Sequence, residues 1–331
     1  MNIIEQKQII NKISDICFSD KTKLTDIISN IVIKGQNIGF AIDIFGRALN
    51  EIEEIKIVAI NKLSEIPDIG KISIILTSSK DTVKESKGKK AKYVIDGVKK
   101  VILVASGKGG VGKSTVAALI AEQLNSDGYK VGIVDADIYG PSIPQIFGIS
   151  GVPELLYNKI TPLKSRNIEI ISIGFLIHNS SAIVWRGPMA SKTIYQLLSL
   201  TNWNNLDYLI IDMPPGTGDI HLSILENYQL DGVIMVTTPQ KMASIDVERS
   251  IDLYKKFSLP ILGIIENMSY LIESGSDKKI NIFSGNSGEE FAKKHNIPLI
   301  CTIPILPQLA LNCDNSESLV EVIRLPIKEF I

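Results

Sequence analysis

The segment VILVASGKGGVGKST, residues 101–115, decides the fold of this chain. A short apolar run leads into a loop with four glycines, and the loop ends on Lys113, Ser114 and Thr115. Gly-x4-Gly-Lys-Ser between a strand and a helix is the pattern of the phosphate-binding P-loop. In such a loop the backbone N–H groups converge on a phosphate, the lysine reaches the β- and γ-phosphates, and the hydroxyl binds Mg²⁺. The segment therefore predicts a site for ATP and Mg²⁺.

The chain around this loop alternates short apolar runs with helical segments. The runs are VILVA, KVGIVD, IEIISIG, DYLIID, GVIMVTT and ILGIIE. Continuous apolar strands between helices are typical of a parallel sheet that is covered on both faces. We therefore expect a doubly wound α/β P-loop NTPase domain over residues 100–331.

The N-terminal part predicts a separate small α+β domain over residues 1–79. We expect helices over 3–16 and 47–63 and strands over 31–34, 38–44 and 71–77. The second helix has apolar residues three to four positions apart, which gives it one face to cover a sheet. A polar, lysine-rich stretch follows, and we interpret residues 80–99 as a linker. Its lysines could touch nucleic acid, but without interleaved aromatic residues a solvated linker is favoured.

Composition limits the class of protein. The 331 residues include 35 Lys and Arg against 36 Asp and Glu, so no global field favours a polyanion. Cys17, Cys301 and Cys313 are too far apart for a disulfide framework or a zinc site. There is no signal peptide pattern and no apolar run of the roughly 18 residues that span a bilayer. We expect a cytoplasmic protein that binds neither nucleic acid nor membrane.

Lys108 is a second lysine in the loop, on the side away from the phosphate-holding position. With it, GKGGVGKST resembles the deviant Walker A motif of the MinD/ParA/nitrogenase-iron-protein class. The resemblance implies that Lys113 serves the chain's own ATP, that Lys108 reaches the nucleotide of a second subunit, and that hydrolysis needs a homodimer. The expected nucleotide-binding residues of the loop are Gly107, Lys108, Gly109, Gly110, Val111, Gly112, Lys113, Ser114 and Thr115.

Carboxylates follow two of the predicted strands. Asp135 and Asp137 lie in VDADIYGPSIP, and Asp212 lies in LIIDMPPGTGD. Carboxyl ends of parallel strands surround the crevice where ligands bind. By the resemblance, Asp137 positions the attacking water and Asp212 lies near Mg²⁺, so the expected catalytic residues are Lys108, Lys113, Asp137 and Asp212. Ser114, Asp137 and Asp212 are the expected Mg²⁺ ligands. Asp135 and Asp219 could instead cap a turn and a helix.

Six segments in order resemble the Mrp/ApbC family of iron–sulfur cluster carrier ATPases, over about residues 97–307. They are VASGKGGVGKSTVA, VDADIYGPSIP, VWRGPMASKTIYQLL, DYLIIDMPPGTGDIHLS, VTTPQKMASIDVERSI and IIENMSYL. The resemblance implies a carrier or assembly factor that hydrolyses ATP and delivers clusters to apoproteins. Apo iron–sulfur proteins and a cluster-assembly scaffold are the implied partners, and Asn267 would contact the adenine.

The chain departs from this family where many members carry Cys-x-x-Cys. Glu273 and Ser276 stand at those positions, and neither is a thiolate. Cys313 lies in a polar stretch and should be accessible, so we choose it as the candidate cluster ligand, whereas Cys301 should be buried in a strand. Two alternatives stay open: a positioning ATPase of the MinD/ParA kind, and a nucleotide-switched scaffold that carries no cluster.

Overall fold

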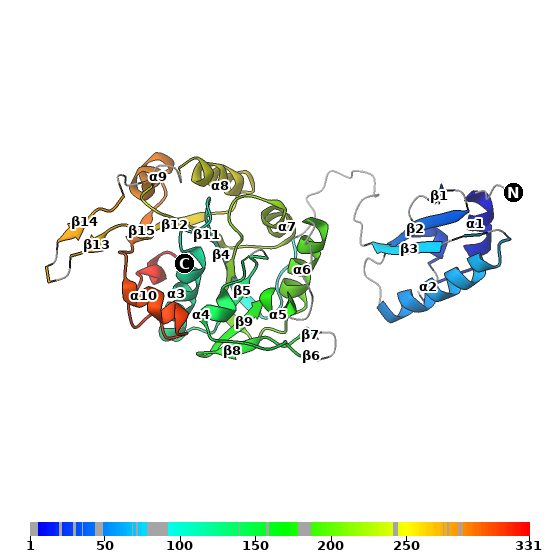
Figure 1. Cartoon of the computed structure of the whole chain (residues 1–331), viewed down its shortest axis with the longest axis horizontal. Coiled ribbons are helices and arrows are strands. Elements are labelled where there is room, and N and C mark those ends of the chain that lie inside the picture. The colour runs from blue at the N-terminus through cyan, green and yellow to red at the C-terminus, as the bar shows by residue number, and fades with distance from the viewer. Residues whose placement is uncertain are drawn as a thin grey trace. The chain divides into compact units, whose positions relative to one another are not determined.

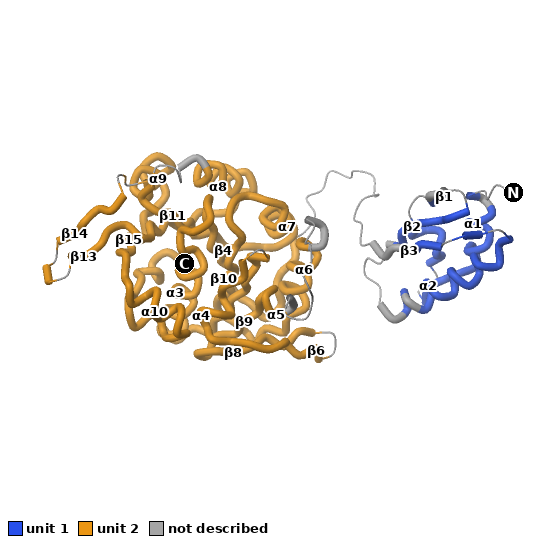
Figure 2. Tube along the Cα trace, viewed as in Figure 1, with its two compact units in different colours: residues 1–89 blue, residues 90–331 orange. Residues whose placement is uncertain are grey.

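The computed structural model consists of two compact units, residues 1–89 and 90–331 (Figure 2). It describes residues 6–19, 22–28, 31–34, 36–43, 49–67, 69–70, 72–77, 92–138, 140–156, 159–177, 187–240, 244–273, 275–276, 278–283, 285 and 287–331. Most of the predicted linker lies outside these residues. Its predicted end at residue 99 falls inside the larger unit, because Tyr93 N donates to Asn227 O and a strand begins at Val98.

The smaller unit has the predicted α+β elements, each within three residues of its expected bounds. They are α1 (Gln6–Ile13), β1 (Val32–Lys34), β2 (Asn37–Asp43), α2 (Leu49–Ser64) and β3 (Ile72–Thr77), with a 3₁₀ turn at Leu24–Asp26. The sheet order is β1-β2-β3, with β2 antiparallel to β1 and parallel to β3. Helix α2 makes the crossover, and it buries Ile52, Ile55, Ala59 and Leu63, which are spaced as one helical face.

The larger unit is built on an eight-stranded sheet of order β15-β12-β11-β4-β10-β5-β9-β8. Every neighbouring pair runs parallel except β8 with β9. The strands are β4 (Val98–Ala105), β5 (Val131–Asp135), β8 (Leu163–Ser165), β9 (Ile168–Ser172), β10 (Leu206–Asp212), β11 (Gly232–Thr237), β12 (Ile261–Glu266) and β15 (Leu299–Thr302). The predicted doubly wound α/β class is confirmed.

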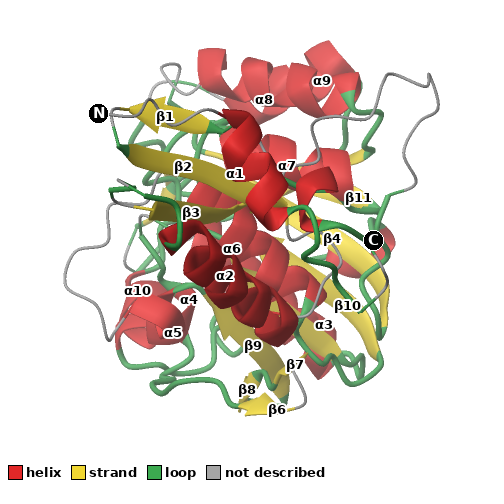
Figure 3. Ribbon diagram, turned by 90° about the vertical axis from the view of Figure 1, so that its right-hand side faces the viewer, coloured by secondary structure: helices red, strands yellow, loops and turns green. Residues whose placement is uncertain are grey.

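Helices cover both faces of this sheet, with α8 and α9 on one side and α3, α4 and α10 on the other (Figures 1 and 3). The helices are α3 (Lys113–Ser126), α4 (Ile143–Ile146), α5 (Gly174–Ile177), α6 (Gly187–Ser199), α7 (Asp219–Asn227), α8 (Ser244–Lys256), α9 (Ser287–His295) and α10 (Pro307–Asp314), and a 3₁₀ turn covers Ile327–Glu329. Two small hairpins complete the unit: β6 (Leu155–Leu156) with β7 (Lys159–Ile160), and β13 (Leu271–Ile272) with β14 (Lys279–Ile280).

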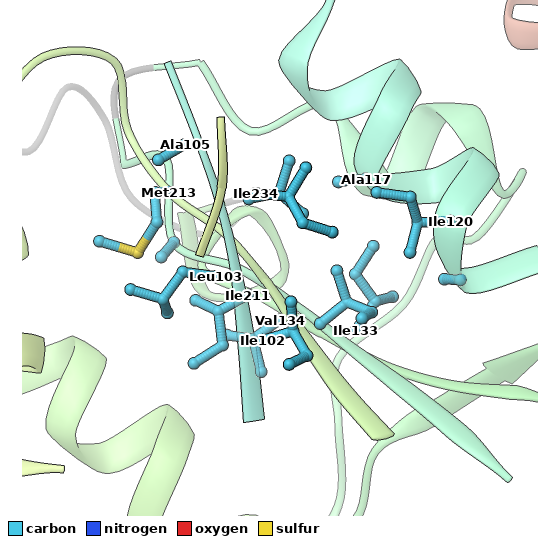
Figure 4. Packing of buried hydrophobic residues seen from close by; sticks show 14 of the residues in the cluster. Ile102, Leu103, Ala105, Ala117, Ile120, Ile133, Val134, Ile211, Met213 and Ile234 are labelled. Atoms are coloured by element: carbon cyan, nitrogen blue, oxygen red, sulfur yellow. The ribbon is translucent and has the colours of Figure 1, made fainter. Parts of the chain in front are cut away.

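The core lies where the central strands meet α3. Ile102 and Leu103 of β4 and Ile211 of β10 are at most 1% exposed. Figure 4 shows Ala117 and Ile120 of α3 next to Ile234 and Ile133, while Leu103 and Ile211 lie farther from this helix. A strand covered on both faces has no polar alternation, which is why the sequence of these strands reads as continuous apolar runs. In the described part of the chain, no helix combines the length and the apolar character needed to cross a bilayer.

Candidate functional site

The three predicted motifs meet at one edge of the sheet. Strand β10 lies between β4 and β5, and in the parallel register Asp212 stands opposite Val104 on one side and Asp135 on the other. The P-loop follows β4 directly. Because carboxyl ends of parallel strands share one edge, the loop and the two acidic segments surround the same space.

The glycines of the P-loop differ in backbone conformation and in how closely other atoms approach them. Gly110 and Gly112 have φ of +79° and +80°, a backbone region that side chains rarely adopt. A Cβ on Gly112 would lie 2.3 Å from Asn267 Nδ2, and a Cβ on Gly107 would lie 2.5 Å from Val247 N of α8. A Cβ on Gly110 would meet nothing within 4 Å. Two glycines therefore admit close neighbours, while Gly110 faces open space.

That space is a cavity of about 320 Å³. Its walls come from the P-loop, from Asp137 and the α4 segment, from Pro215, and from the end of α10. The lining residues are Ser106, Lys108, Gly109, Gly110, Gly112, Lys113, Ser114, Thr115, Asp137, Ser142, Gln145, Ile146, Pro215, Cys313 and Asp314. Half-buried Lys108 lies on this cavity of its own chain, and its carbonyl accepts a hydrogen bond from Ser106 Oγ. The sequence did not single out Ser142, Gln145 or Pro215, although the phrases IYGPSIP and PPGTGD contain or adjoin them.

Lys113 and Asp212 form a buried ion pair at the floor of the cavity. The Nζ to Oδ1 distance is 2.5 Å, and the side chains are 6% and 0% exposed. Lys113 Nζ also donates to Ser114 Oγ at 3.2 Å. Burial raises the pKa of the Asp212 carboxyl, and the Lys113 ammonium opposes this rise. The second oxygen, Asp212 Oδ2, is buried without a partner.

Asp135 anchors the loop that carries Asp137. Its Oδ1 accepts from Asp137 N at 3.1 Å, and its Oδ2 accepts from Ile143 N at 3.2 Å and from Ser172 Oγ at 3.1 Å. Burial, followed by the nearby charge of Asp212, raises the pKa of Asp135 to about 7. The structure thus agrees with the alternative in which Asp135 caps a turn.

The oxygens around the cavity fit a Mg²⁺ ion. Asp137 is 9% exposed, and its Oδ1, like Asp212 Oδ2, is buried without a partner. Three buried carboxylates, of Asp135, Asp137 and Asp212, face one buried ammonium, so a cation would offset the excess negative charge. Within the described ranges, no three or more His, Cys, Asp or Glu side chains are grouped so that they could hold a metal ion by themselves. Mg²⁺ commonly takes one or two carboxylates and completes its shell with phosphates and waters.

Asn267 supports the P-loop. Its Nδ2 donates to Val111 O at 2.9 Å, and its backbone N donates to Thr237 O. It is 6% exposed and is not among the residues that line the cavity. The adenine contact stays a prediction, whereas the bond to Val111 is a role that the motif alone did not indicate.

Cys17 belongs to the smaller unit, whereas Cys301 and Cys313 belong to β15 and α10 of the larger unit. Cys17 is exposed, and Cys301 is half-buried on β15, where burial raises its pKa to about 11. Cys313 is also half-buried, so it is less exposed than expected from its polar stretch, and it lines the cavity. It lies in the last turn of α10 beside the P-loop, with Sγ 3.8 Å from Thr115 Oγ1, and burial raises its pKa. Its role as a cluster ligand stays a prediction.

The expected Cys-x-x-Cys positions form an exposed turn between β13 and β14. Ser276 Oγ donates to Glu273 Oε2 at 3.0 Å there, and both residues are exposed. Asp219 begins α7 and is exposed. Trp185 and Arg186 of the WRGPM phrase, and residues 241–243 of the VTTPQKMAS phrase, lie outside the described residues.

Comparisons with known proteins agree with this geometry. The family described as ParA, NUBPL iron-transfer P-loop NTPase, matches residues 97–327. An iron–sulfur cluster carrier protein of Rickettsia felis is 61% identical over 99% of both chains. One from Aquifex aeolicus is 43% identical over 68% of this chain and 63% of its own length. A nucleotide-binding protein of Archaeoglobus fulgidus, solved with ADP, has a TM-score of 0.63 and 34% identity over 72% of this chain and 94% of its own.

These matches confirm the resemblance drawn from the motifs. They cover the P-loop, both acidic segments and the Asn267 segment in one continuous alignment range. The chain therefore belongs to the ParA family of NUBPL iron-transfer P-loop NTPases.

Proposed function

We propose that this chain is a homodimeric, Mg²⁺-dependent ATPase that carries iron–sulfur clusters to apoproteins. The observation that carries the ATPase part is the buried Lys113–Asp212 pair beneath an open P-loop. The cluster part rests on the relatives, which are named iron–sulfur cluster carrier proteins at up to 61% identity over nearly the whole chain. The three free cysteines suit a reducing cytoplasm.

The Lys113–Asp212 pair gives the site two states. Without nucleotide, the ammonium of Lys113 neutralises Asp212 at 2.5 Å. When phosphates enter the cavity, Lys113 turns to the β- and γ-phosphates and releases Asp212. Ser114, Asp137 and Asp212 would then hold Mg²⁺, which neutralises phosphate charge. Asp137, with a free buried oxygen on the cavity wall, orients the attacking water.

Lys108 is proposed to act in the second subunit. It is half-buried on the cavity wall and is followed by two exposed glycines. A cation supplied from a partner stabilises charge on the transferred phosphoryl group as an arginine finger does. Hydrolysis would then depend on dimer formation, while binding of ADP would not.

A mixing experiment tests the trans arrangement. Lys108→Ala and Asp137→Ala chains should each hydrolyse ATP slowly, and their mixture should regain activity through hybrid dimers that keep one complete site. Lys99→Ala is a matched control, because Lys99 is an exposed lysine near the start of β4. No recovery after subunit exchange has been demonstrated would count against Lys108 acting in trans.

Anaerobic reconstitution with iron and sulfide tests the cluster part. We keep Cys313 as the proposed cluster ligand, and its place on the nucleotide cavity adds an expectation. Bound ADP should slow cluster loading, and Cys313→Ser should abolish the cluster absorption. A wild-type chain that hydrolyses ATP and binds no iron would instead favour the nucleotide-switched scaffold.

A further inference from the structure

His221 is a fully buried histidine that the ATPase motifs do not explain. It lies on α7 with 0% exposure, and both ring nitrogens have partners. Nε2 is 2.9 Å from Pro214 O, and Nδ1 is 3.0 Å from the hydroxyl of Tyr254 on α8. A carbonyl oxygen only accepts, so Nε2 carries the proton and Nδ1 accepts from the tyrosine hydroxyl. Burial lowers the pKa of His221 to about 4, which keeps the ring neutral in this tautomer.

The bond to Pro214 fixes the segment 213–218, which joins Asp212 to α7. Met213 N donates to Val104 O and Gly216 N donates to Ser106 O, both at 3.0 Å. Pro214 and Pro215 have no N–H group, so the backbone cannot add a donor between these two points. His221 supplies the missing bond, at the residue between Met213 and the cavity-lining Pro215.

The second hydrogen bond of His221 joins it to Tyr254 of α8, a helix that also packs against the P-loop. Tyr254 is 0% exposed on α8, and the first turns of the same helix press against Gly107, where a Cβ would lie 2.5 Å from Val247 N. His221 therefore connects the segment after Asp212 to the helix that supports the phosphate loop.

Packing alone does not account for these residues. An apolar side chain would fill the same volume without the desolvation of an imidazole and a phenol hydroxyl. A fully satisfied buried polar network instead specifies one arrangement of the groups that it joins. Here the network fixes the carbonyl of Pro214, which lies two residues after Asp212.

We infer that His221 is a positioning residue, which holds segment 213–218 so that Asp212 and Pro215 keep their places at the cavity. The inference rests on the proposed ATPase function. Because the phosphate cradle itself is built by the P-loop, His221 governs the rate of hydrolysis more than the affinity for ADP.

The test compares His221→Leu, His221→Gln and Tyr254→Phe, with His295→Gln as a control at a histidine on α9. We expect His221→Leu to lower kcat by about 10-fold to 100-fold while the Kd for ADP changes less than about threefold. His221→Gln should retain much of kcat, because its amide N–H can replace the donor to Pro214 O. Tyr254→Phe should give a smaller loss, and His295→Gln should give none.

Hydrogen–deuterium exchange provides a readout that does not depend on turnover. In His221→Leu, the amides of Met213 and of residues 216–218 should exchange at least about 10-fold faster, while α3 keeps its protection. Equal loss of kcat in the Leu and Gln variants, or faster exchange spread evenly through α7 and α8, would reduce His221 to a packing role. An unchanged kcat in His221→Leu would also overturn the inference.

The outcomes separate this inference from the proposed function. If the wild-type chain binds ADP and does not hydrolyse ATP, the ATPase proposal fails, and the kinetic role of His221 fails with it. If the wild type is active and His221→Leu does not fold, Tyr254→Phe decides by the same exchange measurement, with His221→Gln as the variant expected to stay close to the wild type. Unchanged exchange at residues 216–218 in Tyr254→Phe, with wild-type kcat, would refute the positioning role.

Discussion

Replacing Lys113 with methionine should destabilise the larger unit even without nucleotide. The change keeps the length of the side chain and removes the ammonium that lies 2.5 Å from Asp212 Oδ1. At an effective dielectric constant of about 20, the attraction lost is about 7 kcal/mol. Removing one partner of a buried ion pair typically costs about 3–5 kcal/mol of unfolding free energy, because the other charge stays buried and unpaired.

The loss of unfolding free energy should depend on pH, because Asp212 becomes neutral when it binds a proton. The loss of unfolding free energy cannot exceed the free energy needed to protonate Asp212. For a carboxyl with the ordinary pKa of 3.8, that free energy is about 6 kcal/mol at pH 8 and about 3 kcal/mol at pH 6. The pKa of this carboxyl is raised in the folded state, so its folded form binds more protons than its unfolded form. Stability of the variant must therefore fall as pH rises.

Urea unfolding followed by tryptophan fluorescence measures this effect. Trp185 and Trp203 are the two tryptophans of the chain, and both belong to the larger unit. Adding Asp212→Asn to Lys113→Met should restore at least about 2 kcal/mol, since the unpaired charge is then gone. A loss below about 1 kcal/mol, or a double variant no more stable than the single one, would refute the reasoning.

Three further substitutions test other parts of the site. Gly112→Ala should weaken ADP binding at least about 10-fold in a titration, because φ is +80° and the methyl would meet Asn267 Nδ2 at 2.3 Å; wild-type affinity would contradict this. Glu122→Ala should cost about 3–5 kcal/mol in urea unfolding, because it removes a buried carboxylate that pairs with the half-buried Arg166 and accepts from Leu319 N, and Glu122→Gln should cost less. Asp135→Asn should flatten the pH dependence of stability between about pH 4 and 7, where the raised pKa of Asp135 makes the wild type lose stability as pH rises; an unchanged slope would contradict it.

The sequence predicted that Lys113 and Asp212 lie at one edge of the sheet, because each motif is local. Asp212 follows a run of apolar residues that is typical of a buried strand, and Lys113 lies in the glycine-rich pattern of a phosphate-binding P-loop. Parallel strands bring such ends to one edge, so the two residues were expected near each other. Their direct ion pair was not expected, since the motif describes a lysine that already holds phosphate.

Cys313 shows where local composition misleads. Cys313 lies in the polar stretch ALNCDNSES, yet the neighbouring Asn312 is 5% exposed. The side chain of Asn312 is satisfied inside the protein, because its Nδ2 donates to Ser318 O and its Oδ1 accepts from Gln308 Nε2. A polar residue within an exposed stretch can thus be buried when its polar groups are satisfied. The average polarity of a segment does not reveal which face of a short helix is covered, and Cys313 is half-buried next to Thr115 on the cavity wall.

The contacts that hold the motifs in place join distant segments, and this explains why no motif reveals them. Glu122, on the P-loop helix α3, accepts hydrogen bonds from Leu319 N at 2.7 Å and from Val320 N at 3.2 Å. Its ion-pair partner Arg166 donates to Ile146 O and Ser316 O. One buried carboxylate therefore ties the segment after α10 to α3, the helix that begins at the end of the P-loop. Because α10 supplies one wall of the cavity, the shape of the nucleotide site depends on residues nearly 200 positions from the loop that binds phosphate.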